Sequence, residues 1–297
     1  MDRLEAFARD LELQGRSKSY MNTVLWETKR YLSWSKGATE SRETLLAYLA
    51  DMRTKGRRQS TIERAFSNLS VYFDYLIEIG EIQQNPVVLI KKRYLKNYKD
   101  EVRQRQLISI EDAAKMVRAT IDTRDRAILL LFLKTGIRRG ELISLDIADI
   151  DLPGQKILLK PTAKRSNRIV FFDDEVELSL RRWMTARETR YRKRGESALF
   201  ISNKGTRLQT AAIDSLVRVA ASRVGLHDSA SERIEDKFTP HCCRHWFTTH
   251  LLRAGMRREY VQWLRGDAIR EAVDIYYHID PEDVKCAYLA CIPQLGI

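Results

Sequence analysis

The chain reads Thr-Pro-His-Cys-Cys-Arg-His at residues 239–245, and this stretch is predicted to open a helix. Threonine is favoured just before a helix, and proline is accepted at the first helical position because its missing N–H would be unpaired there. His241 and Arg244 lie three positions apart on one face of the first turn, where the helix dipole favours an anion. Such a pair is more often a solvated helix cap, and the alternative interpretation is a phosphate site.

Two further motifs decide between these interpretations. Residues 135–142 read Thr-Gly-Ile-Arg-Arg-Gly-Glu-Leu, and residues 275–278 read Ile-Tyr-Tyr-His. In chain order the three motifs give TGIRxxEL, then HxxRH, then a tyrosine. This ordered set resembles the tyrosine recombinase (phage integrase) family, and the likeness covers roughly the C-terminal two-thirds of the chain.

The resemblance implies a chemistry and a role for each matched residue. Tyr276 would attack a DNA phosphodiester and form a 3′-phosphotyrosyl bond; the family pattern of apolar residue, Tyr, any residue, His favours it over Tyr277. Arg138 and Arg244 would bind the non-bridging phosphate oxygens, and His241 would take the tyrosine proton or hold the phosphate. The reaction needs no metal or nucleotide, so no cofactor is expected.

A catalytic lysine is also implied, on a β-hairpin. Two apolar extended runs, 156–160 and 167–172, predict that hairpin, with a basic loop between them. Lys164 fits the position of the general acid that protonates the leaving 5′-oxygen. Lys160 and Arg165 are its rivals, because the length of this loop varies in the family.

One turn departs from the family pattern. Where relatives carry His or Trp before the nucleophile, this chain has Asp267. An ionised aspartate cannot donate to a phosphate oxygen and would repel it. We therefore expect Asp267 to orient Arg138, Arg244 or the tyrosine hydroxyl, and we expect Glu141 to brace the Arg138 guanidinium.

The fold is predicted to be mainly α with a small β-hairpin or sheet (α+β), in two domains. Residues 1–88 show four amphipathic helical patterns, typical of a small bundle, and resemble the core-binding domain of the family. Residues 89–107 are interpreted as an exposed basic linker, and residues 108–297 as the catalytic domain. The resemblance implies that the two domains close around DNA as a C-shaped clamp. It also implies that the last helix docks on a neighbouring protomer.

Charge supports a nucleic acid partner. The net charge is +12, and clusters of Lys and Arg bind phosphate backbones, although a charge run is often only a solvated surface. The basic residues expected to contact DNA are Lys55, Arg57, Arg58, Arg64, Lys91, Lys92, Arg93 and Arg165.

Several classes of protein are disfavoured. No apolar run approaches the roughly 20 residues of a membrane span, and the N-terminus lacks a signal-peptide pattern, so a cytoplasmic, nucleoid-associated protein is expected. The four cysteines have no CxxC spacing and are interpreted as buried, reduced thiols rather than metal ligands.

These observations predict a site-specific DNA recombinase, an integrase of a virus or mobile element. The resemblance implies three kinds of partner: double-stranded DNA with a specific recombination site, further copies forming a tetramer on two duplexes, and an accessory directionality factor. Alternatives are a Xer-like resolvase of chromosome or plasmid dimers and a type IB topoisomerase-like nicking enzyme. A DNA-binding protein that lost the chemistry is the alternative from another class, which the substitution at Asp267 keeps open.

Overall fold

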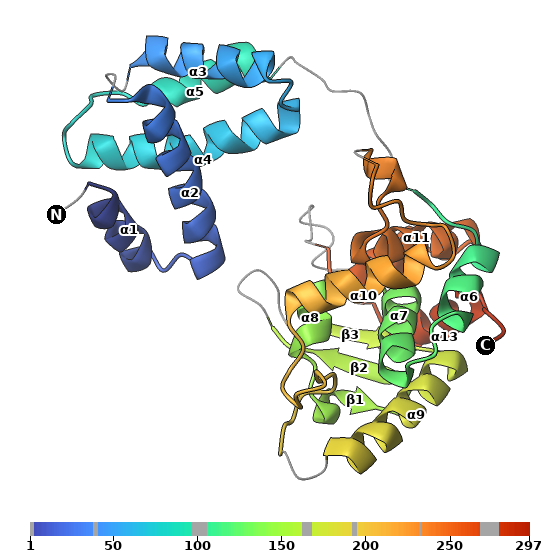
Figure 1. The fold of residues 1–297 in the computed structure, drawn as a ribbon. Coiled ribbons are helices and arrows are strands. Elements are labelled where there is room, and N and C mark those ends of the chain that lie inside the picture. The colour runs from blue at the N-terminus through green and yellow to red at the C-terminus, as the bar shows by residue number, and fades with distance from the viewer. Residues whose placement is uncertain are drawn as a thin grey trace. The chain divides into compact units, whose positions relative to one another are not determined.

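The computed structural model describes residues 3–37, 41–96, 106–161, 168–191, 195–231, 233–267 and 279–297. The chain divides into two compact units, Met1–Val102 and Arg103–Ile297 (Figure 1). Each unit has its own hydrophobic core. The predicted mainly helical fold with one small sheet is confirmed. Within these ranges, every helix is too short or too polar to cross a membrane.

The first unit is a helical bundle around an aromatic core. Its elements are α1 (Arg3–Leu13), α2 (Lys18–Ser35), α3 (Arg42–Thr54), α4 (Gln59–Glu78), α5 (Pro86–Ile90) and a π-helical turn (Lys91–Leu95). Helices α2 and α4 each bury one face, and Tyr31, Phe66 and Phe73 are fully buried between the helices. Such amphipathic helices owe their stability to mutual burial rather than to propensity.

The first part of the predicted basic linker is helical, which corrects the interpretation of residues 89–96 as an exposed strap. Val87 and Ile90 on α5 and Leu95 on the π-helical turn are buried in the core of the first unit. Ile90 and Leu95 are five positions apart, a spacing that fits the wider π turn and not the α-helical period. The basic residues between them therefore belong to a packed helix.

The second unit wraps helices around a three-stranded antiparallel sheet with strand order β1-β2-β3 (Figure 1). Its strands are β1 (Ile150–Asp151), β2 (Lys156–Leu159) and β3 (Arg168–Phe171). Its helices are α6 (Ile110–Arg118), α7 (Thr123–Thr135), α8 (Arg139–Ser144), α9 (Asp174–Tyr191), α10 (Thr210–Ser222), α11 (Pro240–Arg253), α12 (Arg258–Arg265) and α13 (Pro281–Cys291). The predicted pairing of β2 with β3 is present, in a register that sets Leu158 opposite Ile169.

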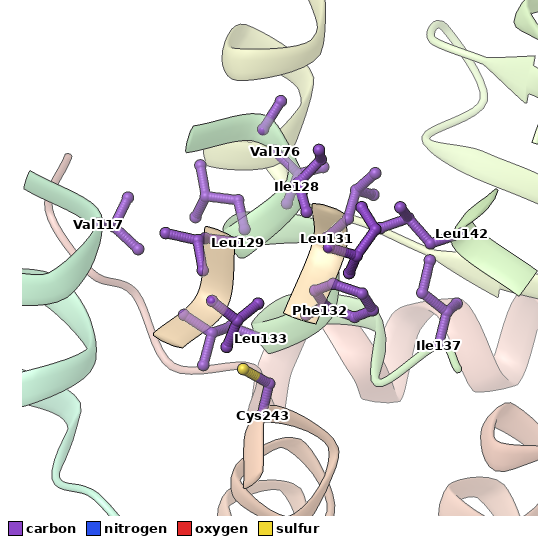
Figure 2. Close-up of a cluster of buried hydrophobic side chains, with 14 of the residues drawn as sticks. Val117, Ile128, Leu129, Leu131, Phe132, Leu133, Ile137, Leu142, Val176 and Cys243 are labelled. Atoms are coloured by element: carbon purple, nitrogen blue, oxygen red, sulfur yellow. The ribbon is translucent and has the colours of Figure 1, made fainter. Parts of the chain in front are cut away.

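Helix α7 forms the centre of this unit. Every residue from Ala127 to Thr135 is buried, and Figure 2 shows side chains leaving the helix on several sides, among them Leu129, Leu131 and Phe132. A helix that is apolar all round must be covered all round. Helices α6, α9 and α11 pack on α7, and the strands contribute to the same core. Helix α7 therefore holds the residues that follow it in a fixed position.

A buried charge cluster closes the C-terminal end of α7. The fully buried Lys134 donates to Asp173 (2.6 Å) and to the carbonyl of Pro293 (2.5 Å), and it pairs with Glu175 (2.5 Å). Glu175 also accepts from the backbone N–H of Leu295 (3.0 Å). These contacts attach the C-terminal residues to the body of their own unit.

Helix α13 also packs on its own unit, where the resemblance had implied docking on a neighbouring protomer. Val284 and Tyr288 are fully buried against Phe247 and Leu251 of α11. The Tyr288 hydroxyl donates to the carbonyl of Lys134 (2.9 Å). In the single chain, the last helix therefore completes its own core.

The cysteines divide into two pairs. Cys242 and Cys243 on α11 are buried, as predicted, and burial raises the pKa of the Cys243 thiol. On α13, however, Cys286 is exposed and Cys291 is half-buried. The prediction of buried thiols was therefore wrong for the second pair, because α13 presents those positions at the surface.

Gly136, which ends α7, should tolerate alanine poorly. Its φ is +58°, and a Cβ there would lie 2.4 Å from Cδ1 of the buried Phe247. Gly255 has a φ of +89° but open space around its Cβ position. Both alanine variants carry left-handed strain of about 1–2 kcal/mol, whereas overpacking adds about 1–3 kcal/mol for Gly136→Ala alone. Urea denaturation should show the larger loss for Gly136→Ala, and equal losses would contradict the packing argument.

Candidate active site

Arg138 is positioned by the sharp turn between α7 and α8. It occupies the N-cap of α8, and its backbone N–H donates to a carboxylate oxygen of Glu141 (2.7 Å). Its guanidinium donates to Glu141 (3.4 Å) and to the backbone carbonyl of Arg265 (3.2 Å). Glu141 therefore holds both the main chain and the side chain of Arg138.

Arg168 is a functional-site residue that the sequence analysis missed. It lies at the start of β3 and donates to both carboxylate oxygens of Glu141 (3.0 and 2.9 Å). Both side chains are about nine-tenths buried, with 10% and 8% exposed. A bidentate pair of this kind fixes orientation strongly. Arg168 thus fixes the orientation of the Glu141 carboxylate, and Glu141 in turn orients Arg138.

Gly266 makes room for this pair. It ends α12 with a φ of +58°, and a Cβ there would lie 2.5 Å from Cδ of Arg168. Glycine adopts this left-handed conformation without steric cost. Glycine at this turn therefore serves close packing as well as backbone shape.

Arg244 reaches the same place from the first turn of α11. It is 6% exposed and donates to the carbonyls of Gly136 (2.5 Å) and Arg265 (2.8 Å). Burial, together with the nearby guanidiniums of Arg138, Arg265 and Arg168, lowers the pKa of Arg244 to about 9, so it stays charged at neutral pH. The guanidiniums of Arg138 and Arg244 thus both donate to the backbone carbonyl of Arg265. Their proximity creates a strong local excess of positive charge.

Asp267 is a second acidic residue in this cluster, in addition to Glu141. One carboxylate oxygen lies 3.5 Å from Nη2 of Arg244 and 3.6 Å from Nη2 of Arg138, and the other lies 2.8 Å from Nε of Arg265. Its side chain is 33% exposed. Asp267 therefore lies within ion-pair distance of both arginines, and its role in orienting them or the tyrosine hydroxyl stays a prediction.

An open pocket of about 810 Å³ lies in front of the arginines. His241, whose side chain is exposed, contributes to its wall beside Arg138 and Arg244. The remaining lining residues are Ile137, Arg139, Gly140, Ala211, Asp214, Arg218, Thr239, Pro240 and Arg265. A predominantly cationic pocket with two fixed guanidiniums is suited to an oxyanion such as a phosphodiester.

Of the residues predicted for the catalytic lysine and the nucleophile, only Lys160 is among the described residues. Lys164, Arg165, Tyr276 and Tyr277 lie outside the described residues. The rival Lys160 pairs with Asp146 and Asp149 and donates to a backbone carbonyl, and its hydrogen bond to Asp146 raises its pKa. A lysine held by two carboxylates is a poor proton donor near neutral pH, which argues against the Lys160 alternative.

In the first unit, two predicted basic groups lie at one end of the bundle. Lys55, Arg57 and Arg58 are exposed between α3 and α4, and Arg64 is exposed one turn later. Two contacts join this end to the π-helical turn that carries Lys91, Lys92 and Arg93: Arg53 donates to the carbonyl of Tyr94 (2.8 Å), and Gln59 donates to that of Leu95 (2.9 Å).

The chain is similar in sequence and in fold to several known proteins. The tyrosine recombinase XerC of Thermodesulfovibrio yellowstonii is 28% identical over 286 residues, covering 92% of this chain and 90% of the relative. A structure of the Tn1549 transposon integrase in complex with transposon right end DNA is 18% identical, with a TM-score of 0.69, covering 97% of this chain and 98% of that one.

A lambda integrase tetramer bound to a Holliday junction is also 18% identical with a TM-score of 0.69, covering 92% of this chain and 76% of that one. These two likenesses extend over almost the whole chain and agree in fold. The model of the phage integrase family matches residues 100–283, which include the pocket and its arginines. The chain therefore belongs to the phage integrase family, the tyrosine recombinases, which cleave and rejoin DNA through a tyrosine intermediate.

Proposed function

We propose that this site-specific recombinase integrates or excises a viral or mobile element, with the pocket of Arg138 and Arg244 as its active site. The observation that carries the residue assignment is the convergence of these two guanidiniums at one cationic pocket. They are held there by Glu141 and by backbone carbonyls. Preorganised donors of this kind stabilise the charge that develops on phosphate oxygens.

The proposed reaction conserves the energy of the cleaved bond. The Tyr276 hydroxyl attacks phosphorus, the Tyr O–P bond forms, and the bond to the 5′-oxygen breaks. Lys164 protonates that leaving oxygen, and His241 accepts the tyrosine proton or holds the phosphate. The reverse attack by a 5′-hydroxyl of a partner duplex then reseals DNA without ATP.

The two units suggest a division of labour. We propose that residues 1–88 bind the core DNA site and residues 108–297 carry the chemistry. In the first unit, the basic residues at one end of the bundle would contact phosphates. A tetramer on two duplexes is supported by the likeness to the lambda integrase assembly, and a directionality factor would be a further partner. A recombinase that acts on genomic DNA would be located at the nucleoid, in the cytoplasm.

A Xer-like dimer resolvase is the second candidate, because the sequence relative carries the name XerC. Both candidates use the same chemistry and differ in their DNA site. The DNA around the chain's own gene separates them, since an integrase acts at the ends of its element.

A covalent-adduct assay tests the proposal. The protein is incubated with nicked duplexes that cover the DNA around its gene, quenched in SDS, and any adduct is mapped by mass spectrometry. We expect an adduct on Tyr276 that is lost in Tyr276→Phe and kept in Tyr277→Phe. Specific binding without an adduct would overturn the enzymatic assignment for this chain and favour the binding-only alternative.

A further inference from the structure

Asp267 contacts both pocket arginines, Arg138 and Arg244, at the place where an anionic substrate would bind. A single carboxylate oxygen of Asp267 lies within ion-pair distance of both Nη2 of Arg244 (3.5 Å) and Nη2 of Arg138 (3.6 Å). A non-bridging oxygen of a phosphodiester would need to make the same two contacts. We infer that Asp267 occupies the phosphate site of the DNA-free enzyme as an internal substitute anion, which the substrate phosphate must displace.

The rest of the turn supports this role. The carbonyl of Arg265, at the C-terminal end of α12, accepts from both Arg138 and Arg244, and the negative end of a helix dipole adds to its attraction. Asp267 follows immediately, and its second oxygen pairs with Arg265 (2.8 Å). The end of α12 therefore supplies acceptors to both arginines before any DNA is present.

Such an anion has two opposite effects. It keeps two like-charged guanidiniums together and oriented, which repulsion between them would otherwise oppose. It also competes with phosphate, since an ionised carboxylate accepts but cannot donate. With its side chain a third exposed, the carboxylate can yield to a substrate that approaches from the pocket. Asp267 is thus a positioning residue that sets the affinity of the site for phosphate.

Inorganic phosphate is the probe for this inference, because it requires neither a target sequence nor cleavage. Calorimetric titration should show phosphate binding about tenfold more tightly to Asp267→Asn than to the unmodified protein. Asp267→Glu, which keeps the charge, should bind as weakly as the unmodified protein. The gain should disappear when Arg138→Gln is added to Asp267→Asn, because the probe then loses one of its two guanidiniums.

Asp214→Asn is the matched control. Asp214 lines the same pocket but pairs with Arg139, so its neutralisation changes the pocket charge equally without freeing Arg138 or Arg244. An equal gain in this variant would overturn the inference in favour of general electrostatics. Unchanged phosphate binding by Asp267→Asn would overturn the inference, because Asp267 would then not compete with phosphate. Weaker binding would overturn it too, because Asp267 would then only support the arginines structurally.

The inference rests on the proposed function, yet the two fail separately. Absence of the Tyr276 adduct would refute the recombinase chemistry whatever the phosphate titrations show. A normal adduct together with unchanged phosphate affinity in Asp267→Asn would leave the recombinase and remove the internal anion.

Discussion

Replacing Arg244 by lysine should slow strand cleavage by about 10²- to 10³-fold, the usual cost of losing a preorganised donor to a developing oxyanion. The Arg244 guanidinium is held by the carbonyls of Gly136 and Arg265, and this fixes the direction of its remaining donors. Lysine keeps the charge but not the planar fork, so it cannot make these two contacts and bind phosphate as well. Single-turnover cleavage of a nicked suicide duplex measures the effect.

Arg187→Lys provides the control for this measurement. Arg187 is also 6% exposed and also donates to two backbone carbonyls, those of Ala198 (3.1 Å) and Glu196 (2.5 Å). It is not among the residues that line the pocket. Its replacement should cost stability and leave the cleavage rate of the folded protein within a few-fold. If both variants lost cleavage equally, the Arg244 effect would be one of folding rather than catalysis.

Replacing Lys134 by methionine should lower the free energy of unfolding by about 3–5 kcal/mol, the usual cost of removing one partner from a buried ion pair. Asp173 and Glu175 would lose their shared cation, and the carbonyl of Pro293 would lose its donor. Methionine approximates the length of the lysine stem, so the loss reports charge more than volume. Thermal and urea denaturation of the full chain measure it.

Acidification should reduce the difference in unfolding free energy between wild type and Lys134→Met. Burial acts to raise the pKa of Glu175, but hydrogen bonds from Lys134, Leu295 and Ile297 outweigh it and lower the pKa below its usual value. A carboxylate with a lowered pKa stabilises the fold above its unfolded pKa of about 4.3. That contribution is lost as pH falls through the folded value. The difference in unfolding free energy between wild type and Lys134→Met should therefore narrow below about pH 4.3.

Lys156→Met is the matched surface substitution. Lys156 pairs with Asp151 at 3.4 Å, and both side chains are nearly half exposed. Exposed pairs of this kind contribute about 0–1 kcal/mol. A loss from Lys156→Met as large as that from Lys134→Met would show that the buried cluster has no special role.

Sequence motifs predicted the parts of the site whose side chains follow local patterns. Arg138, Glu141 and Arg244 each lie in a short motif at a helix start, and the described geometry brings all three together. Arg168 was missed because its bond to Glu141 joins a strand to a helix far away in the chain. Arg265 was missed because it supplies a backbone carbonyl, which any residue type could provide.

The basic linker shows a different limit of pattern analysis. Its lysines and arginines dominate the composition, and its few apolar residues lack an α-helical period. The segment that contains Ile90 and Leu95 is nevertheless packed, because a π turn changes the spacing that brings side chains to one face. Such turns are rare, so composition favoured the wrong structure. The role of Lys134 could not be predicted from local patterns either, because its partners lie on distant segments of the chain.

The two native cysteines of α13 allow the position of this helix to be followed by thiol alkylation, without introducing a new cysteine. Cys286 is exposed, whereas Cys291 is half-buried, with its Sγ 3.7 Å from the carbonyl of Ala254. Cys242 and Cys243 are buried and should react slowly. Alkylation of Cys291 relative to Cys286 therefore reports how often the last helix leaves its own domain. Recorded with and without DNA, this ratio would show whether the helix is released when the enzyme assembles.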